Sequence, residues 1–336
     1  MLLKLPVALD FRASNVGWMQ AVVIDQGSLR LEERATPVPA SREVLVATDF
    51  AGINAADLLQ RRGAYPAPPG WPVDVPGMEF SGRVVALGGD VDASLLGRRV
   101  CAIVGGGAQA THCLVPAAHL IDVPDIVAMD QAGGFAEAFI TAFDSLVLQG
   151  RLREGDRLLI SGASGGVGCA AIQIGRLVGA HITAVARSRE HDQALRDLGA
   201  DEVIPLEEVT NVAPVNVVLE LVGAAHLSLV QSRLASFARI VVIGVAGGGS
   251  KTEINLLNFM STRSTLTGST LRSRTSEEKA DVIHRVGLSL TGPWSRGTLR
   301  VPIAATFPLA EVDEAYEFFA RPGKFGKVLL AMPLSA

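Results

Sequence analysis

The stretch from Arg157 to Ser188 reads RLLISGASGGVGCAAIQIGRLVGAHITAVARS, and it decides the fold. An apolar run at 158–160 enters a glycine-rich turn. A segment with helical periodicity follows, and a second apolar run spans 182–186. A strand, a glycine turn, a helix and a second strand within about 30 residues predict a βαβ unit that binds a dinucleotide.

The glycine turn contains the residues that a bound diphosphate requires. Gly165 lets the main chain approach the phosphates closely, and Gly168 lets the helix pack tightly on its strand. The diphosphate then accepts hydrogen bonds from unpaired N–H groups at the positive end of the helix. Because Ala163 stands where the first glycine is usual, the prediction depends on the flanking strands and helix. The expected contacts come from Ser164, Gly165, Gly166, Val167 and Gly168.

The end of the second strand favours NADP(H) over NAD(H). An NAD site usually has an acidic residue about 20 residues further on, which binds the ribose 2′-hydroxyl. Here the strand ends in Arg187, Ser188 and Arg189, and the first acid is Glu190. Arginine can hold a 2′-phosphate, and each charge-assisted hydrogen bond contributes roughly 1.5 to 3 kcal/mol. The alternative is that both arginines lie on a solvated turn.

Length and composition limit the class of protein. The 336 residues predict two domains, and 49% hydrophobic with 19% charged residues is typical of a globular chain. A net charge of −4 without a basic tract argues against a nucleic-acid partner. No apolar run of about 18 residues exists, so we expect no membrane partner. Cys101, Cys113 and Cys169 lack paired spacing, which predicts free buried thiols and a cytoplasmic location.

The residue pattern, and with it the predicted secondary structure, changes along the chain. Residues 1–18 are expected to form an N-terminal extension. Residues 19–130 contain short alternating runs between Gly, Pro and Asp turns, which predict a β-rich domain that residues 277–336 complete. Residues 131–276 alternate strands with helices and predict a doubly wound parallel sheet. The expected helices are 190–198, 226–235, 277–290 and 308–319, and the expected later strands are 217–221, 240–244, 266–270 and 328–331.

Few residues are arranged for metal or nucleophilic chemistry. His112 and Cys113 are adjacent, so in a strand they face opposite sides, and the six histidines are scattered without CxxC or HxxxH spacing. We therefore expect no metal. Ser164 lies in GASGG, which is not the GxSxG turn of a serine hydrolase. The remaining chemistry is hydride transfer from a nicotinamide, which needs positioning and exclusion of water.

Two further segments allow a comparison with a known family. Zinc alcohol dehydrogenases have a G-x-C-H-x-D loop and a P-G-H-E turn, where this chain reads GINAAD at 52–57 and PGME at 76–79. Asn54 thus replaces a cysteine ligand and Met78 a histidine ligand. From Met19 to about Pro333 the chain resembles the zinc-independent quinone oxidoreductases, related to zeta-crystallin, of the medium-chain dehydrogenase/reductase superfamily. The resemblance also implies a metal-free site.

The resemblance is closest to the tumour-suppressor-inducible quinone oxidoreductases. It is carried by RRGAYP at 61–66, GGGAQA at 105–110 and GSTLRSR at 268–274. It implies an α/β protein with a GroES-like β-rich catalytic domain, a Rossmann domain and a homodimer. It also implies a nicotinamide near Asn54 and Thr141, a loop around Leu271 beside the ring, and main-chain contacts from Gly244 and Val245. Relatives often have a tyrosine at the adenosine end, where this chain has Leu206.

Four residues have a structural alternative to a role in the site. Asn54 either orients the ring and the substrate carbonyl or caps a helix that begins at Ala55. Tyr65 either stacks on and donates to a quinone or packs its proline-rich loop. Thr141 either binds the carboxamide or is an ordinary helix residue. Lys327 either approaches the cofactor phosphates or is solvated.

The sequence therefore predicts an NADPH-dependent reductase of a quinone, with Asn54 and Tyr65 as the catalytic residues. A pocket without a strong acid suits such an acceptor, because water can protonate the reduced anion. An NADPH-dependent enoyl or alkenal reductase, acting on an enone, remains an alternative. The second alternative is a non-catalytic NADPH-binding redox sensor.

Overall fold

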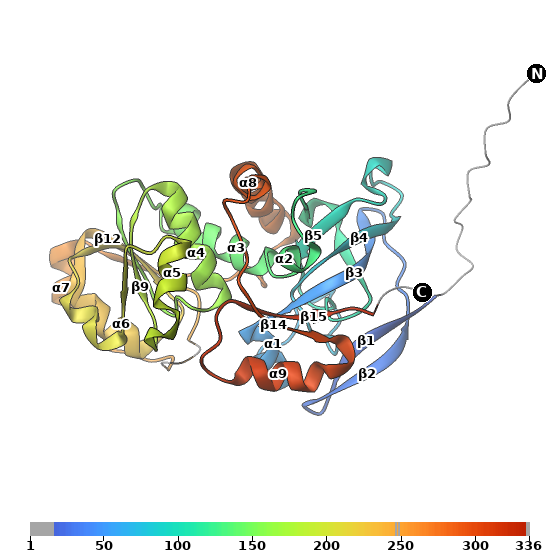
Figure 1. Ribbon diagram of the computed structural model, residues 1–336, viewed down its shortest axis with the longest axis horizontal. Coiled ribbons are helices and arrows are strands. Elements are labelled where there is room, and N and C mark those ends of the chain that lie inside the picture. The colour runs from blue at the N-terminus through green and yellow to red at the C-terminus, as the bar shows by residue number, and fades with distance from the viewer. Residues whose placement is uncertain (1–16, 246, 248, 334–336) are drawn as a thin grey trace, which may run out of the picture.

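The computed structural model describes residues 17–245, 247 and 249–333, so most of the expected N-terminal extension lies outside the described residues. Figure 1 shows two sheets side by side, with helices on both faces of one of them. The first sheet consists of six parallel strands in the order β10-β9-β8-β11-β12-β13. These strands are β8 (Arg157–Ile160), β9 (His181–Val185), β10 (Glu202–Ile204), β11 (Val215–Glu220), β12 (Leu234–Val242) and β13 (Thr265–Gly268).

This strand order is that of a doubly wound dinucleotide-binding sheet, as the sequence predicts. Its central strands are buried on both faces, and Leu158, Leu159 and Ile160 of β8 are completely inaccessible to solvent. Helices on both faces explain why such strands read as continuous apolar runs. The covering helices are α4 (Gly166–Val178), α5 (Asp192–Leu198), α6 (Ala224–Val230) and α7 (Leu256–Thr262). The order reverses between β8 and β11, where ligands of open α/β sheets bind.

The second sheet is mixed and has seven strands, in the order β14-β15-β3-β4-β5-β7, with β6 paired to β3. Its last strand, β15, runs antiparallel to β3, so the end of the chain completes a sheet built from its beginning. The domain boundaries at 130/131 and 276/277 stay predictions. The strands are β3 (Glu43–Ile53), β4 (Glu79–Leu87), β5 (Arg99–Ile103), β6 (His112–Pro116), β7 (Leu120–Asp122), β14 (Ile303–Pro308) and β15 (Lys327–Ala331).

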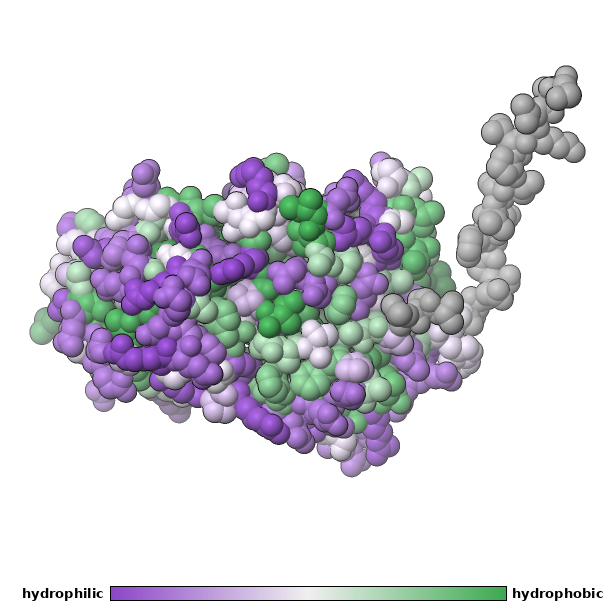
Figure 2. All heavy atoms as spheres, in the orientation of Figure 1, coloured by the Kyte–Doolittle hydropathy of each residue, from purple (hydrophilic) through white to green (hydrophobic). Residues whose placement is uncertain are grey.

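Smaller elements surround this sheet. A separate hairpin of β1 (Trp18–Asp25) and β2 (Ser28–Ala35) turns at Gln26 and Gly27, both at positive φ. The helices are α1 (Ala55–Arg61), α2 (Met129–Gly133) and α9 (Val312–Ala320). As Figure 2 shows for one face, apolar residues lie among polar ones near the centre of the view, while polar residues dominate on the left.

The two sheets share a continuous apolar core around α3 (Ala136–Phe143). This core includes Ile103 of β5 and Leu158 of β8, together with Trp294 of α8 (Ser276–Ser295). The Phe135 ring stacks on Phe139 at 4.3 Å and on Trp294 at 3.8 Å between centroids. Helix α3 continues into a π-helical turn at Asp144–Gln149. Packed, rigid elements therefore join the two sheets.

Several predicted elements have wrong ends, among them the strand expected at 240–244, which the structure has at Leu234–Val242. The helix expected at 226–235 stops at Val230, and β12 begins at Leu234. Pro308 ends the half-exposed strand β14, and α9 begins only at Val312. Helix α8 extends five residues beyond the predicted 290, through Pro293 to Ser295. In each case the local apolar spacing fits two element types, and pairing with a neighbouring strand or packing against α3 decides between them.

Candidate active site

The turn between β8 and α4 has the shape of a diphosphate cradle. Gly165 is the N-cap of α4, and the main chain from Ser164 to Val167 is partly exposed. A Cβ atom on Gly165 would meet only the Gly162 carbonyl oxygen, at 3.5 Å. A Cβ on Gly168 would lie 2.6 Å from the Ala163 Cα and from two main-chain oxygens, so only glycine allows the helix this close. Open space at one glycine and close packing at the other fit a bound diphosphate.

The residues after β9 form a small basic hollow. Arg187, Ser188 and Arg189 line a cavity of about 30 Å³ at the carboxyl end of the sheet. Arg189 pairs with Glu208 at 3.3 Å and with Asp192 at 3.9 Å. Within the described part of the chain, Arg187 makes no ion pair. The two arginines therefore differ, because only Arg187 carries a charge that no carboxylate offsets.

A second cation lies near Arg187. Burial, and then the positive charge of Arg187, lower the pKa of the Lys324 ammonium from its usual value. The Lys324 ammonium also donates to the Arg321 carbonyl oxygen at 3.1 Å. Leu206, where relatives often have a tyrosine, begins a 3-10 turn close to the hollow and is partly exposed. This end of the sheet thus combines two cations with an aliphatic side chain.

Lys327 is buried, and the prediction of a solvated lysine is wrong. Only 4% of its side chain is exposed, and its ammonium donates to Asn54 Oδ1 at 2.6 Å and pairs with Glu79 Oε1 at 2.5 Å. Its stem lies against the dinucleotide turn, because a Cβ on Gly166 would be 2.5 Å from the Lys327 Cδ. The cause is tertiary: β15 is an inner strand of the mixed sheet, and the Gly326 N–H donates to the Ser164 carbonyl oxygen at 2.8 Å.

Asn54 caps α1, which confirms the structural alternative for this residue. Its main-chain N–H donates to Asp57 Oδ2 at 2.7 Å, and its side-chain amide donates to Glu79 Oε1 at 3.0 Å. The Asn54 side chain is thereby fixed between Lys327 and Glu79. Burial raises the pKa of the Asp57 carboxyl to about 6, although N–H donors from Asn54 and Gly77 act in the opposite direction.

Tyr65 lies under the loop that contains Leu271. The Arg272 guanidinium stands 4.8 Å from the centroid of the Tyr65 ring, and the Tyr65 hydroxyl is 3.5 Å from the Thr270 hydroxyl. Arg272 also donates to the Gly105 carbonyl at 2.8 and 3.0 Å and to the Tyr65 carbonyl at 3.0 Å. Arg272 is 7% exposed. It anchors the loop after β13 to the domain that contains the mixed sheet. Leu271 is buried beside it.

Two acids that the sequence analysis did not select lie beside these residues. Glu79 is completely buried, and its Oε2 accepts from the Glu137 N–H at 2.9 Å. Glu137 precedes Thr141, which is 7% exposed, by one turn of α3. Burial first, and then the Glu79 carboxylate, raise the pKa of Glu137 to about 8. A single acid inside FAEAFITAF, and one directly after PGM, are the sequence signals that could have identified them.

Gly244 and Val245 follow β12 at the same edge of the sheet. The Gly244 N–H donates to the Glu220 carbonyl oxygen at 3.3 Å, and Val245 is 49% exposed. A fully buried pair between Glu220 and His226 fixes the neighbouring turn after β11. The predicted residues after β8, β9 and β12 therefore lie along one carboxyl edge of the parallel sheet, whereas Asn54, Tyr65 and Lys327 belong to the elements around the mixed sheet and Thr141 to α3.

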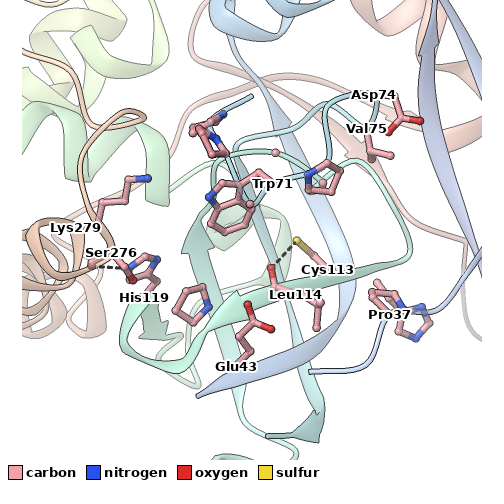
Figure 3. A pocket seen from close by; sticks show the side chains of 18 of the residues that line it. Pro37, Glu43, Trp71, Asp74, Val75, Cys113, Leu114, His119, Ser276 and Lys279 are labelled. Atoms are coloured by element: carbon pink, nitrogen blue, oxygen red, sulfur yellow. Dashed lines mark hydrogen bonds between the residues drawn. The ribbon is translucent and has the colours of Figure 1, made fainter. Parts of the chain in front are cut away.

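A separate cavity lies away from these residues. It has a volume of about 830 Å³ and is lined by the proline-rich loop, β6 and the start of α8. Figure 3 shows Trp71, Cys113, His119 and Lys279 around it. None of the predicted site residues lines this cavity. Among residues 17–245, 247 and 249–333, no three His, Cys, Asp or Glu side chains are grouped so that they could hold a metal ion.

Known proteins share both halves of this architecture. The sequence family described as the alcohol dehydrogenase GroES-like domain matches residues 40–148, and the family described as zinc-binding dehydrogenase matches residues 166–286. The chain belongs to the medium-chain dehydrogenase/reductase superfamily, and it is an oxidoreductase of the kind that binds a nicotinamide cofactor.

Three individual proteins illustrate how similar the chain is to its relatives. The chain is 29% identical over 310 residues to the human quinone oxidoreductase, which covers 89% of this chain and 92% of the relative. It is 34% identical over 229 residues to a phthiocerol polyketide synthase subunit of Mycobacterium tuberculosis, covering 65% of this chain and 10% of that protein. An alcohol dehydrogenase superfamily protein from Novosphingobium aromaticivorans superimposes with a TM-score of 0.82 at 27% identity, covering 94% of this chain and all of the other.

None of the helices in the described residues is long and apolar enough to cross a membrane.

Proposed function

We propose that this protein is an NADPH-dependent quinone oxidoreductase that transfers hydride to an electron-poor conjugated acceptor without a metal. The observation that carries the proposal is the glycine cradle at 164–168, with the unpaired Arg187 at the end of the next strand. Similarity to quinone oxidoreductases over nearly the whole chain supports the choice of acceptor.

When bound, NADPH supplies a hydride from its nicotinamide ring. The residues of the chain position it. Ser164, Gly165, Gly166, Val167 and Gly168 form the turn that binds the diphosphate, and Arg187, Ser188 and Arg189 bind the 2′-phosphate. Asn54, Thr141, Leu271 and the main chain of Gly244 and Val245 surround the nicotinamide. Tyr65 lines the acceptor site beneath Arg272, and Lys327 braces the turn through Gly166.

The proposal of a metal-free site rests on what surrounds Asn54. In this position the chain has an amide whose oxygen accepts from the Lys327 ammonium, and that ammonium also pairs with Glu79. A buried ammonium at this place repels a divalent cation, and the Met78 thioether is a soft, uncharged donor. The available donors thus suit a lysine-bridged network better than zinc.

The cofactor assignment is tested by exchanging the charge of Arg187. In Arg187→Glu, loss of one charge-assisted bond and a new repulsion should raise the KM for NADPH about 10- to 100-fold while the KM for NADH changes little. Arg157→Glu is the matched control. Arg157 is exposed and begins β8, so it lies at the amino end of the parallel sheet, whereas Arg187 lies at the carboxyl end. An unchanged ratio of NADPH to NADH efficiency in Arg187→Glu contradicts the 2′-phosphate assignment.

Reduction of a C=C bond next to a carbonyl is the second candidate. It requires the same scaffold and the same hydride geometry as quinone reduction, and a polyketide synthase subunit is among the relatives of the chain. A steady-state screen of quinones and enones with both nicotinamides separates the two reductases. Tight NADPH binding without oxidation by any acceptor in the panel would instead identify a redox sensor.

We also propose a homodimer in the cytoplasm. Strand β13 is an edge strand with all four residues exposed, and α7 next to it exposes Leu256, Leu257 and Met260 by 70% or more. An unpaired edge flanked by apolar side chains is a natural pairing surface. The three cysteines are free and buried, which suits a reducing compartment.

A further inference from the structure

Glu137 is placed to act on the acceptor. It is the second residue of α3 and lies one turn before Thr141, on the same face of the helix. Side chains four residues apart on a helix are neighbours, at about 5 to 6 Å between their Cβ atoms. If Thr141 contacts the nicotinamide, as proposed above, the Glu137 carboxyl lies next to the ring.

Glu137 is the one member of its cluster, within the described residues, that is not fully buried. Its charged neighbours come from four other elements: Glu79 on β4, Lys327 on β15, Asp57 on α1 and Arg272 after β13. Glu79 and Lys327 are buried and bonded to each other. The Glu137 side chain is partly exposed, and within the described residues its carboxyl makes no hydrogen bond. A carboxyl without a protein partner at a site otherwise fully paired is available to a ligand.

The cluster also favours the protonated form of this carboxyl. Burial and the adjacent Glu79 carboxylate raise the pKa to about 8, while Lys327 and Arg272 lower it less. At neutral pH Glu137 therefore carries a proton that it can donate. The sequence predicts water as the source of this proton, so the donor differs from that expectation.

We propose that Glu137 is the general acid of the reaction, donating its proton to the reduced acceptor; this inference rests on the proposed function. Hydride from the nicotinamide C4 adds two electrons and one hydrogen to the acceptor, and NADPH becomes NADP⁺. The acceptor becomes a hydroquinone monoanion or an enolate, whose proton comes from the Glu137 carboxyl. The O–H bond of Glu137 breaks, and solvent at its partly exposed carboxylate restores the proton.

The test compares Glu137→Gln with wild type and with Glu314→Gln, an exposed control on α9. The rate of NADPH oxidation is measured from about pH 6 to pH 10, with 1,4-naphthoquinone and with 3-penten-2-one as acceptors. Glu137→Gln should lose about 100-fold in kcat at pH 7 on the enone, at the lower end of general-acid contributions, and less on the quinone, whose anion is less basic. The KM for NADPH should not change.

The pH profile separates a proton donor from a merely structural residue. The wild-type kcat on the enone should fall about tenfold per pH unit above pH 8, and Glu137→Gln should lack this fall. An active wild type whose rate and profile persist in Glu137→Gln overturns the inference alone. A wild type that oxidises NADPH with neither acceptor overturns the proposed function with it.

A second measurement serves if the variant does not fold. Carbon-13 NMR of labelled glutamate in the wild-type protein follows each carboxyl without turnover. Glu137 should titrate near pH 8, and a midpoint near the ordinary value of about 4.3 overturns the inference.

Discussion

Three glycine substitutions separate the folding role of the dinucleotide turn from its binding role. Gly168→Ala places a methyl group 2.6 Å from the Ala163 Cα and from main-chain oxygens, which cannot move like a flexible side chain. Overpacking of this kind costs about 1 to 3 kcal/mol, and backbone neighbours place Gly168→Ala at the upper end. We expect a loss of about 3 kcal/mol in the free energy of unfolding, together with weaker binding of NADPH.

Gly165→Ala should weaken NADPH binding without a large loss of stability. Its methyl group meets only the Gly162 oxygen, at 3.5 Å, and the residue has an extended conformation that alanine adopts freely. Stability should change by less than about 0.5 kcal/mol. The methyl group, however, occupies the space into which the diphosphate must come. NADPH should bind at least about tenfold more weakly, which corresponds to roughly 1.4 kcal/mol.

Gly287→Ala on α8 is the matched control. No atom lies within 4 Å of its added Cβ, so removing a helical glycine should stabilise the protein by up to about 1 kcal/mol without changing cofactor affinity. Urea unfolding gives the stabilities, and quenching of tryptophan fluorescence or calorimetry gives the affinities. If Gly165→Ala binds NADPH as tightly as wild type does, the phosphates do not lie on this turn, and the reasoning is refuted.

Four further results are expected. Arg272→Ala should cost about 3 kcal/mol of stability, because the buried Gly105 carbonyl loses its donor; an unchanged urea midpoint would contradict this. Leu266→Lys, on the exposed edge of β13, should convert a dimer to monomers in sedimentation experiments, and a persistent dimer would exclude this edge. A chelator should leave turnover unchanged, and inhibition that zinc reverses would refute the metal-free proposal. Burial raises the pKa of Asp57 from 3.8 to about 6, so the folded state holds that proton more tightly than the unfolded state. Wild-type stability should therefore fall by about 2 kcal/mol between pH 4 and pH 6 relative to Asp57→Asn, and parallel curves would disprove the shift.

Local sequence determined much of the parallel sheet. The apolar runs of β8 and β9 and the helical period between them depend on interactions within about 30 residues, so they can be read directly. The glycine positions are equally local, because contact at Gly168 involves residues only five or six positions away. Arg187 could also be selected from sequence, since its place after β9 follows from the βαβ pattern.

The sequence by itself thus determined the class of fold, the glycine turn after β8 and the arginines that follow β9. Only the tertiary structure decided which polar side chains are buried together. Lys327 looks like a solvated residue near the end of the chain, but pairing of β15 with β3 places it against Asn54 and Glu79, about 250 residues away in sequence or more. The protonation of Glu137 depends on the same long-range neighbours, because desolvation and a nearby carboxylate are properties of the packed site rather than of the residue.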